Sequence, residues 1–158
     1  MLDWYSKKHS RVVRSTYAAE LLSLLDATNQ GRLLQLCLEE VLRGARAAAT
    51  LIEQSGRILP LDVGVDAKAV YDSITAVSPK TPDDKHLLLH VRAMREFLEA
   101  NYVDRLYWFG TDDMLPDGLT KGCIDREALI KVCLEGIWQI RHEQPQHWQA
   151  DHGTQDGG

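Results

Sequence analysis

Short strand-like runs alternate with helical segments along this chain, and this alternation limits its fold more than any other feature does. The run Leu61-Asp-Val-Gly-Val-Asp66 is short and apolar, which favours a buried strand. Segment 83–101 instead places apolar side chains on one stripe, as amphipathic helices do. Strand-like segments lie at 3–14, 59–65 and 105–109, and helical segments lie at 16–28, 32–54, 67–77 and 83–101. The alternation predicts an α/β protein in which helices cover a sheet.

Capping and turn residues give the expected helix boundaries. Thr16 is an N-cap candidate for the first helix, whose apolar stripe is formed by Tyr17, Leu21, Leu24, Leu25 and Thr28. Asn29-Gln30-Gly31 predicts the end of that helix, and a second helix is then expected from about Arg32 to Gln54. Further along, we expect a short helix over 116–121 and a helix capped by Asp125 that runs to about Leu134.

The length of 158 residues predicts one domain, which we place at 1–141, followed by a polar and disordered tail at 142–158. No segment resembles a signal peptide or a membrane span, and the three cysteines are unpatterned and fit a reducing compartment. We therefore expect an intracellular protein, cytoplasmic or nuclear. The net charge of −5 disfavours a passive DNA-binding module.

Three acidic residues occur where an acid is unexpected: Glu20, Asp66 and Asp117. Glu20 lies beside an apolar helix stripe, where a charge is costly unless it is paired, binds metal or reaches water. Asp66 ends a strand, so it is either the N-cap of the next helix or part of a ligand site at the carboxyl end of the sheet. Asp117 either complements a helix dipole or joins that site. The three carboxylates could converge on a divalent metal ion.

Other residues compete for the same roles. Asp62 lies on the same strand face as Asp66 but nearer the start of the strand, and Asp112 and Asp113 precede Asp117 in a loop. His86 and His90 have the i, i+4 spacing of zinc ligands, although no H-E-x-x-H frame accompanies them. The sequence contains no P-loop, no G-x-G-x-x-G and no G-x-S-x-G motif.

Five short motifs follow one another along the chain. Trp4-Tyr-Ser-Lys-Lys-His9 is followed by Val12-Val-Arg-Ser-Thr-Tyr-Ala-Ala-Glu20 and then by Val65-Asp-Ala-Lys-Ala-Val70. Next come Lys85-His86, His90 and Arg95-Glu96, and finally Thr111 with Leu115-Pro-Asp-Gly-Leu-Thr-Lys121. In this order the motifs resemble those of the ribonuclease H domain at the end of copia-type retrotransposon polyproteins. The resemblance runs from Trp4 to about Leu129.

The resemblance implies a ribonuclease H-like fold, with a mixed sheet flanked by helices, and hydrolysis of the RNA strand of an RNA–DNA hybrid. It also implies two Mg²⁺ ions, with Mn²⁺ as an alternative, held by four acids. The last three of these acids correspond to Glu20, Asp66 and Asp117, which would be both catalytic and metal-binding. The implied partners are the hybrid and the upstream reverse transcriptase segment of a polyprotein, with no membrane.

This chain departs from the family at the first of the four metal-binding acids. In the family, that aspartate lies on the first strand, well upstream of the tryptophan motif, whereas Asp3 here is adjacent to the motif. We therefore expect an N-terminally truncated domain that lacks the first strand and its aspartate. Two hypotheses follow: a ribonuclease that is impaired until the upstream segment is supplied, or a non-catalytic remnant that serves as a structural or interaction domain.

Overall fold

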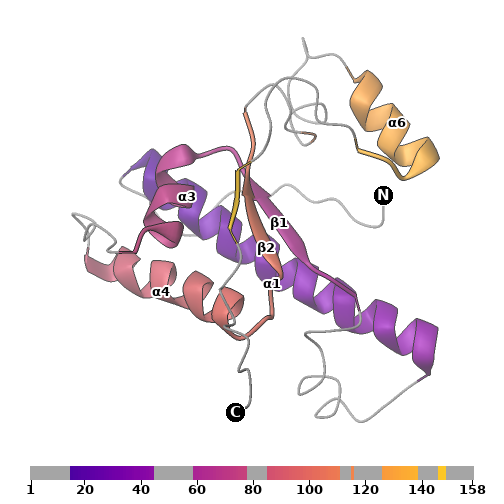
Figure 1. The fold of residues 1–158 in the computed structure, drawn as a ribbon, viewed down its shortest axis with the longest axis horizontal. Coiled ribbons are helices and arrows are strands. Elements are labelled where there is room, and N and C mark those ends of the chain that lie inside the picture. Colours follow the sequence, from indigo (N-terminus) through magenta and orange to yellow (C-terminus); the bar gives the residue numbers. More distant parts are fainter. Residues whose placement is uncertain are drawn as a thin grey trace, which may run out of the picture.

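The described sheet has three strands in the order β1, β2, β3 (Figure 1). The computed structural model describes residues 15–44, 59–77, 85–110, 115, 126–138 and 146–148. Strands β1 (Asp62–Val65) and β2 (Arg105–Trp108) pair in parallel, with Val63 opposite Leu106. Strand β3 (Gln146–Trp148) pairs antiparallel with the other edge of β2. The described fold is therefore a mixed α/β one, as the alternation predicts.

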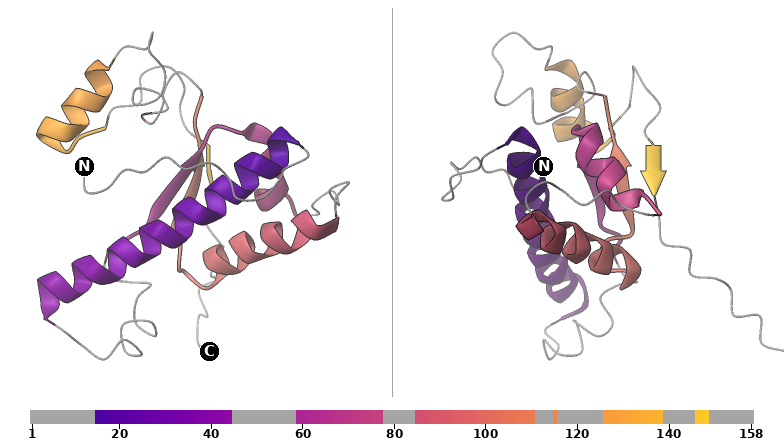
Figure 2. Two further views of the ribbon diagram at one scale, coloured as in Figure 1. Left: turned by 180° about the vertical axis from the view of Figure 1, so that it is seen from behind. Right: turned by 90° about the vertical axis from the view of Figure 1, so that its left-hand side faces the viewer.

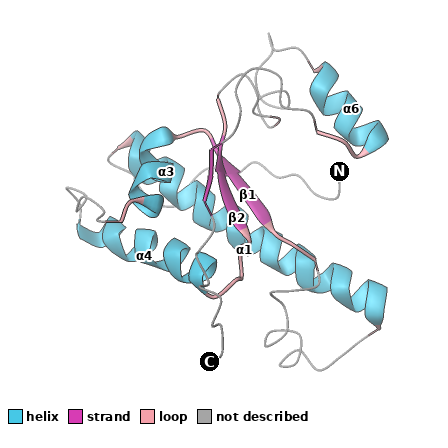
Figure 3. Cartoon of the chain, viewed as in Figure 1, coloured by secondary structure: helices cyan, strands magenta, loops and turns pink. Residues whose placement is uncertain are grey.

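Helices α1 (Thr16–Arg43), α3 (Lys68–Thr75) and α4 (Lys85–Glu99) pack beside and behind the parallel pair in the view of Figures 1 and 3. Helix α1 crosses behind the strands in Figure 1 and in front of them when the molecule is seen from behind in Figure 2. One face of β1 is buried and the other is exposed, because its side chains alternate between the two faces. The core contains Leu21, Leu24, Leu25, Val63, Val65, Val70, Ile74, Leu87, Val91, Met94, Leu98 and Leu106.

The other face of the sheet carries aromatic side chains near its carboxyl end. The Tyr107 and Phe109 rings stack with their centroids 5.6 Å apart, and the Trp138 ring lies 4.5 Å from that of Phe109. The Phe109 ring also lies directly over Gly64, in space that any larger residue at that position would need. Trp138 follows helix α6 (Glu127–Glu135), so this aromatic contact connects the C-terminal helix to the sheet.

Helix α1 corrects the prediction of two separate helices. It continues through Asn29-Gln30-Gly31 and ends at Gly44, whose φ is 83°. A glycine inside a helix costs about 1 kcal/mol relative to alanine, but Gly31 allows Leu61 to pack against the helix backbone. An added Cβ would lie 3.0 Å from Leu61 Cδ1. The helix continues because this tertiary contact compensates for the weak local propensity.

The start of α1 also differs from the prediction by one residue. Ser15 rather than Thr16 is the N-cap, and its side chain accepts a hydrogen bond of 3.1 Å from the Ala18 backbone N–H. This bond satisfies one of the amide groups that a helix leaves without a partner at its start. Both residues carry a hydroxyl group, so the type of cap was predicted correctly and only its position was wrong.

Apart from β3, the remaining described elements agree with their predicted positions to within a few residues. The stripe Leu87, Val91, Met94 and Leu98 of α4 is buried, as its spacing predicts. Strand β1 begins at Asp62 rather than at Leu59. Helix α6 lies where a helix is expected, but its N-cap is Arg126 rather than the predicted Asp125. Segments 3–14, 45–54 and 116–121, together with Asp125, lie outside the described residues. Strand β3 is the described part of 142–158, where composition predicts disorder.

Candidate active site

The carboxyl ends of β1 and β2 form the part of the molecule where the sequence places its candidate acids. Because the two strands are parallel, these ends lie at the same edge of the sheet. The Phe109 backbone N–H donates to the Val65 carbonyl at 3.1 Å, and the Trp108 indole N–H donates to the Asp66 carbonyl at 3.1 Å. Asp66 is half-buried, and its backbone is fixed against the end of β2.

The start of α3 shows that Asp66 is not the N-cap of the helix that follows it, which was the alternative to a role in a ligand site. The N-cap of this helix is Ala67, and no side-chain hydrogen bond caps it. The Ala67 carbonyl instead accepts hydrogen bonds from the backbone N–H groups of Val70 at 3.0 Å and Tyr71 at 3.1 Å. The carboxylate of Asp66 is therefore not used as a helix cap, which was the main competing explanation for an aspartate at this junction.

Glu20 lies in the second turn of α1 and is half-buried. The next residue, Leu21, is fully buried in the core, so the helix places Glu20 at the boundary between core and solvent. One turn earlier, the Tyr17 hydroxyl donates to Ser73 Oγ at 2.8 Å, and Ser73 in turn donates to the Val70 carbonyl at 2.8 Å. These bonds connect the beginning of α1 to α3, the helix that starts just after Asp66.

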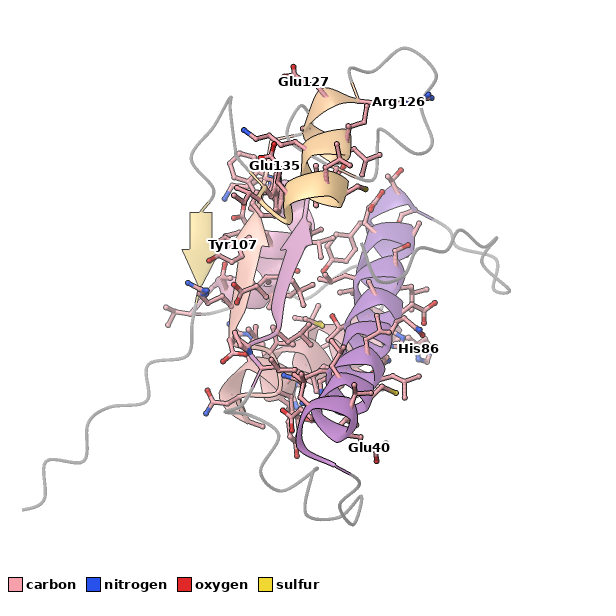
Figure 4. All side chains as sticks on the ribbon, turned by 90° about the vertical axis from the view of Figure 1, so that its right-hand side faces the viewer. Glu40, His86, Tyr107, Arg126, Glu127 and Glu135 are labelled. Carbon is pink, nitrogen blue, oxygen red and sulfur yellow. The ribbon has the colours of Figure 1, made fainter. Side chains whose placement is uncertain are left out.

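The beginning of α1 and the carboxyl ends of β1 and β2 lie toward the same end of the molecule (Figures 1 and 4). Two of the three candidate acids therefore come from adjoining elements of one core, whereas Asp117 lies outside the described residues. Within the described ranges, no three His, Cys, Asp or Glu side chains gather closely enough to hold a metal ion. The three-acid site remains a prediction. Of its three residues, the structure describes Glu20 and Asp66.

A lysine that the sequence did not single out, Lys68, follows Asp66 by two residues. Lys68 Nζ is 2.6 Å from Asp72 Oδ1, and it lies over the rings of Tyr71 and Trp108 at 4.9 and 5.0 Å from their centroids. Burial raises the pKa of the Tyr71 phenol, and the adjacent Asp72 carboxylate raises it further. The i, i+4 spacing of Lys68 and Asp72 is readable from sequence, whereas the contact with Trp108 depends on how the strands pair.

Asp62, the competing acid on the same strand, has a different role. Its carboxylate accepts two hydrogen bonds from the Arg105 guanidinium, at 3.1 and 2.7 Å, across the paired strands. These bonds are the main cause of a raised pKa for Arg105. Asp62 also lies at the start of β1, at the opposite end of the strand from Asp66. The structure thus separates the two acids that the sequence left in competition.

The histidine pair gives no support to a zinc site. His86 is exposed and His90 is half-buried, both in the first half of α4. Figure 4 shows His86 at the surface of the molecule. Neither of these histidines belongs to a cluster of three metal-type ligands among the residues that the structure describes.

A buried polar cluster at the opposite end of the sheet was not predicted. The Arg32 guanidinium lies 4.4 Å from the centroid of the Tyr102 ring and donates to Gln35 Oε1 at 2.9 Å, and Gln35 donates to the Leu59 carbonyl. Burial lowers the pKa of Arg32, which Tyr102 and Glu39 partly counteract. Glu39 is fully buried, and its carboxylate oxygens accept no hydrogen bond from the described part of the chain.

Comparisons of the chain with family models, with curated proteins and with solved structures find no match. None of the helices in the described ranges is long and apolar enough to cross a membrane.

Proposed function

We propose that the chain is a ribonuclease H-like domain of copia-type retrotransposon origin that acts on the RNA strand of RNA–DNA hybrids. Glu20, Asp66 and Asp117 are its metal-binding carboxylates. The observation that carries the proposal is the position of Asp66 at the carboxyl end of a parallel strand, with its side chain not used as a helix cap. The order of the five sequence motifs supports it independently.

The described donors have the chemistry that Mg²⁺ and Mn²⁺ require. Both cations prefer oxygen ligands, and carboxylates are the usual protein donors. Glu20 and Asp66 are half-buried, so their surroundings combine contact with the core and access from solvent. When bound, the ions would activate a water molecule and stabilise the leaving oxygen of the phosphodiester. The protein's part is to hold the carboxylates in place on α1 and at the end of β1.

The proposal requires a fourth carboxylate. In the family this is an aspartate well upstream of the tryptophan motif, and Asp3 is the one acid among residues 1–14. We propose that the fourth ligand comes from an upstream segment such as the reverse transcriptase part of a polyprotein. A two-metal site without this ligand is strongly impaired, so the chain alone should show little or no cleavage.

The hybrid is proposed as the substrate because of the sequence resemblance. To bind this anionic substrate, the chain must overcome its own net charge of −5. Basic residues near the N-terminus offer contacts to phosphates: Lys7, Lys8, Arg11 and Arg14. Discrimination of RNA from DNA would depend on the 2′-hydroxyl groups and on the shape of the hybrid groove.

A cleavage assay with Mg²⁺ or Mn²⁺ and a labelled hybrid tests the proposal. It compares the chain of 158 residues with a form extended at its N-terminus by a strand that carries an aspartate. Cleavage by the extended form, abolished in Asp66→Asn, is the expected result. Asp62→Asn is the matched control and should leave cleavage intact. It removes a carboxylate from the same strand, but this carboxylate is paired with Arg105.

Two results would reject the catalytic proposal: an inactive extended form that is folded by circular dichroism, or full activity in Asp66→Asn. Either outcome would favour the alternative, a non-catalytic remnant that serves as a structural or interaction domain.

A further inference from the structure

A hydrogen bond between two side chains joins the start of α1 to α3, and each partner belongs to an element that carries or follows a candidate acid. The Tyr17 hydroxyl donates to Ser73 Oγ at 2.8 Å. Tyr17 lies three residues before Glu20, so the two side chains project from the same side of α1. Ser73 lies on α3, the helix that begins two residues after Asp66. The start of α1 lies beside α3 in the opposite views of Figures 1 and 2.

The α3 side of this bond is firmly connected to Asp66. The Trp108 indole N–H donates to the Asp66 carbonyl at 3.1 Å, which holds the end of β1 against β2. Ala67, the next residue, packs against the hydrophobic core. The Ser73 hydroxyl donates to the Val70 carbonyl at 2.8 Å, so its oxygen is left to accept the bond from α1. The acceptor is therefore fixed relative to the strand end that carries Asp66.

The α1 side carries Glu20, and apolar packing alone does not fix the direction of this side chain. Leu21 and Leu24 are buried in the core, so they determine how closely the helix approaches α3 and α4. Apolar contacts are not directional, whereas a hydrogen bond depends on both distance and angle. The bond from Tyr17 therefore restrains the rotation of α1 about its own axis in a way that the leucines do not.

A small rotation of α1 has a large effect at Glu20. The ends of helix side chains lie about 5–6 Å from the helix axis, so a rotation of about 10° displaces the Glu20 carboxylate by about 1 Å. A binding site needs its groups within about 0.5 Å of the productive geometry. A restraint on the rotation of α1 is thus sufficient to decide whether Glu20 and Asp66 can share one ligand.

We infer that Tyr17, through its hydrogen bond to Ser73, is a positioning residue that holds the Glu20 carboxylate at the separation from Asp66 that a divalent cation requires. The inference rests on the proposed function, because it takes Glu20 and Asp66 as ligands of the same ion. Tyr17 itself does not bind the ion. Its role differs from a purely stabilising one because it predicts a change in metal affinity.

Titration of the full chain of 158 residues with Mn²⁺ tests the inference without cleavage. Electron paramagnetic resonance follows the free ion, and Glu20→Gln and Asp66→Asn identify the binding that depends on the two acids. Tyr17→Phe should raise the dissociation constant of this binding about fivefold, the factor that corresponds to about 1 kcal/mol, the worth of one hydrogen bond. Ser73→Ala should raise it by a similar factor, and the double variant should raise it no further, because both substitutions remove the same bond.

Thr28→Val is the matched control, because it also removes a hydroxyl group from α1. The Thr28 hydroxyl donates to the Leu24 carbonyl at 2.8 Å and lies 3.6 Å from Met94 Sδ on α4, so it does not join α1 to α3. This variant should leave the affinity for Mn²⁺ unchanged. Circular dichroism and urea unfolding establish that the compared variants are folded during the titrations.

Three results would overturn the inference: no Mn²⁺ binding that depends on Glu20 and Asp66, an unchanged dissociation constant in Tyr17→Phe, or an equal rise in Thr28→Val. The last result would mean that any loosening of α1 weakens the site. Failure of the proposed function gives a different result. If Tyr17→Phe weakens Mn²⁺ binding selectively but the N-terminally extended form does not cleave the hybrid, the positioning role stands and the nuclease activity is rejected.

Discussion

The two halves of α1 belong to one continuous helix but pack in opposite senses. In the first half, Leu21 and Leu24 face the core, while Glu20 lies at its boundary. In the second half, Gln35 and Glu39 are buried, whereas Leu33 and Val41 are exposed. The difference follows from what each half contacts. The first half meets the apolar sides of α3 and α4, whereas the second half meets the polar backbone around Leu59 and, through its own Arg32, the ring of Tyr102.

This contrast shows that the pattern of a helix predicts its packing only where its neighbours are apolar elements of the same fold. Where the neighbours are polar, the helix can bury its polar side and leave leucine and valine exposed. Four substitutions test the contrast, and they are arranged from the largest expected effect to the smallest.

The largest effect is expected at Leu21, in the first half of the helix. Leu21→Ala should lower the free energy of unfolding by about 2–5 kcal/mol, because it opens a cavity in a core where Leu21 is fully buried. Val41→Ala in the second half should change it by less than about 0.5 kcal/mol. Urea unfolding followed by circular dichroism measures both values. Equal effects at the two positions would show that the two halves are packed alike.

The second largest effect is expected at Glu39, and it has the opposite sign. Glu39→Leu should raise the free energy of unfolding by about 1–3 kcal/mol, because it removes a buried carboxylate that accepts no hydrogen bond from the described residues. Arg32 loses the attraction of the Glu39 charge but retains its contacts with Gln35 and Tyr102. Glu40→Leu is the matched control at an exposed position and should have little effect. A destabilised Glu39→Leu variant would mean that the carboxylate has a stabilising partner.

The sequence predicted the elements better than it predicted their surroundings. The spacing of Leu87, Val91, Met94 and Leu98 identified both α4 and its buried face, because one apolar stripe met one apolar core. The break at Gly31 was wrongly predicted, because the contact with Leu61 connects residues that are distant in sequence. The burial of Glu39 was missed for the same reason, since local pattern carries no information about Leu59 or Tyr102.

For the candidate site too, the sequence predicted the local features but not the contacts between distant residues. Asp66 was placed correctly at a strand end, because the short apolar run and the helix after it are local features. The resemblance favours Asp66 over Asp62, but the sequence offers no physical reason to set Asp62 aside. The strand register adds one, because it places Arg105 opposite Asp62.

A smaller effect is expected where the first half of α1 is joined to α3. Tyr17→Phe should lower the free energy of unfolding by about 1 kcal/mol, because it removes a partly buried hydrogen bond to Ser73. A double-mutant cycle with Ser73→Ala measures the interaction itself, provided that the lost bond from Ser73 to the Val70 carbonyl is counted in the single variant. Independent, additive effects of the two substitutions would show that the hydroxyl groups do not interact in solution.

The smallest effect is expected at Gly31, where the two halves of α1 meet. Alanine gains about 1 kcal/mol of helix propensity over glycine, but its Cβ would lie 3.0 Å from the Leu61 side chain. Leu61 is only half-buried and its methyl group can shift, so Gly31→Ala should stabilise the chain by less than the full propensity gain. In a Leu61→Ala background the steric conflict is absent and the same substitution should yield the full gain of about 1 kcal/mol. Equal gains in both backgrounds, measured by urea unfolding, would show that Leu61 does not press on the helix, and that local sequence alone decides why α1 continues through this glycine.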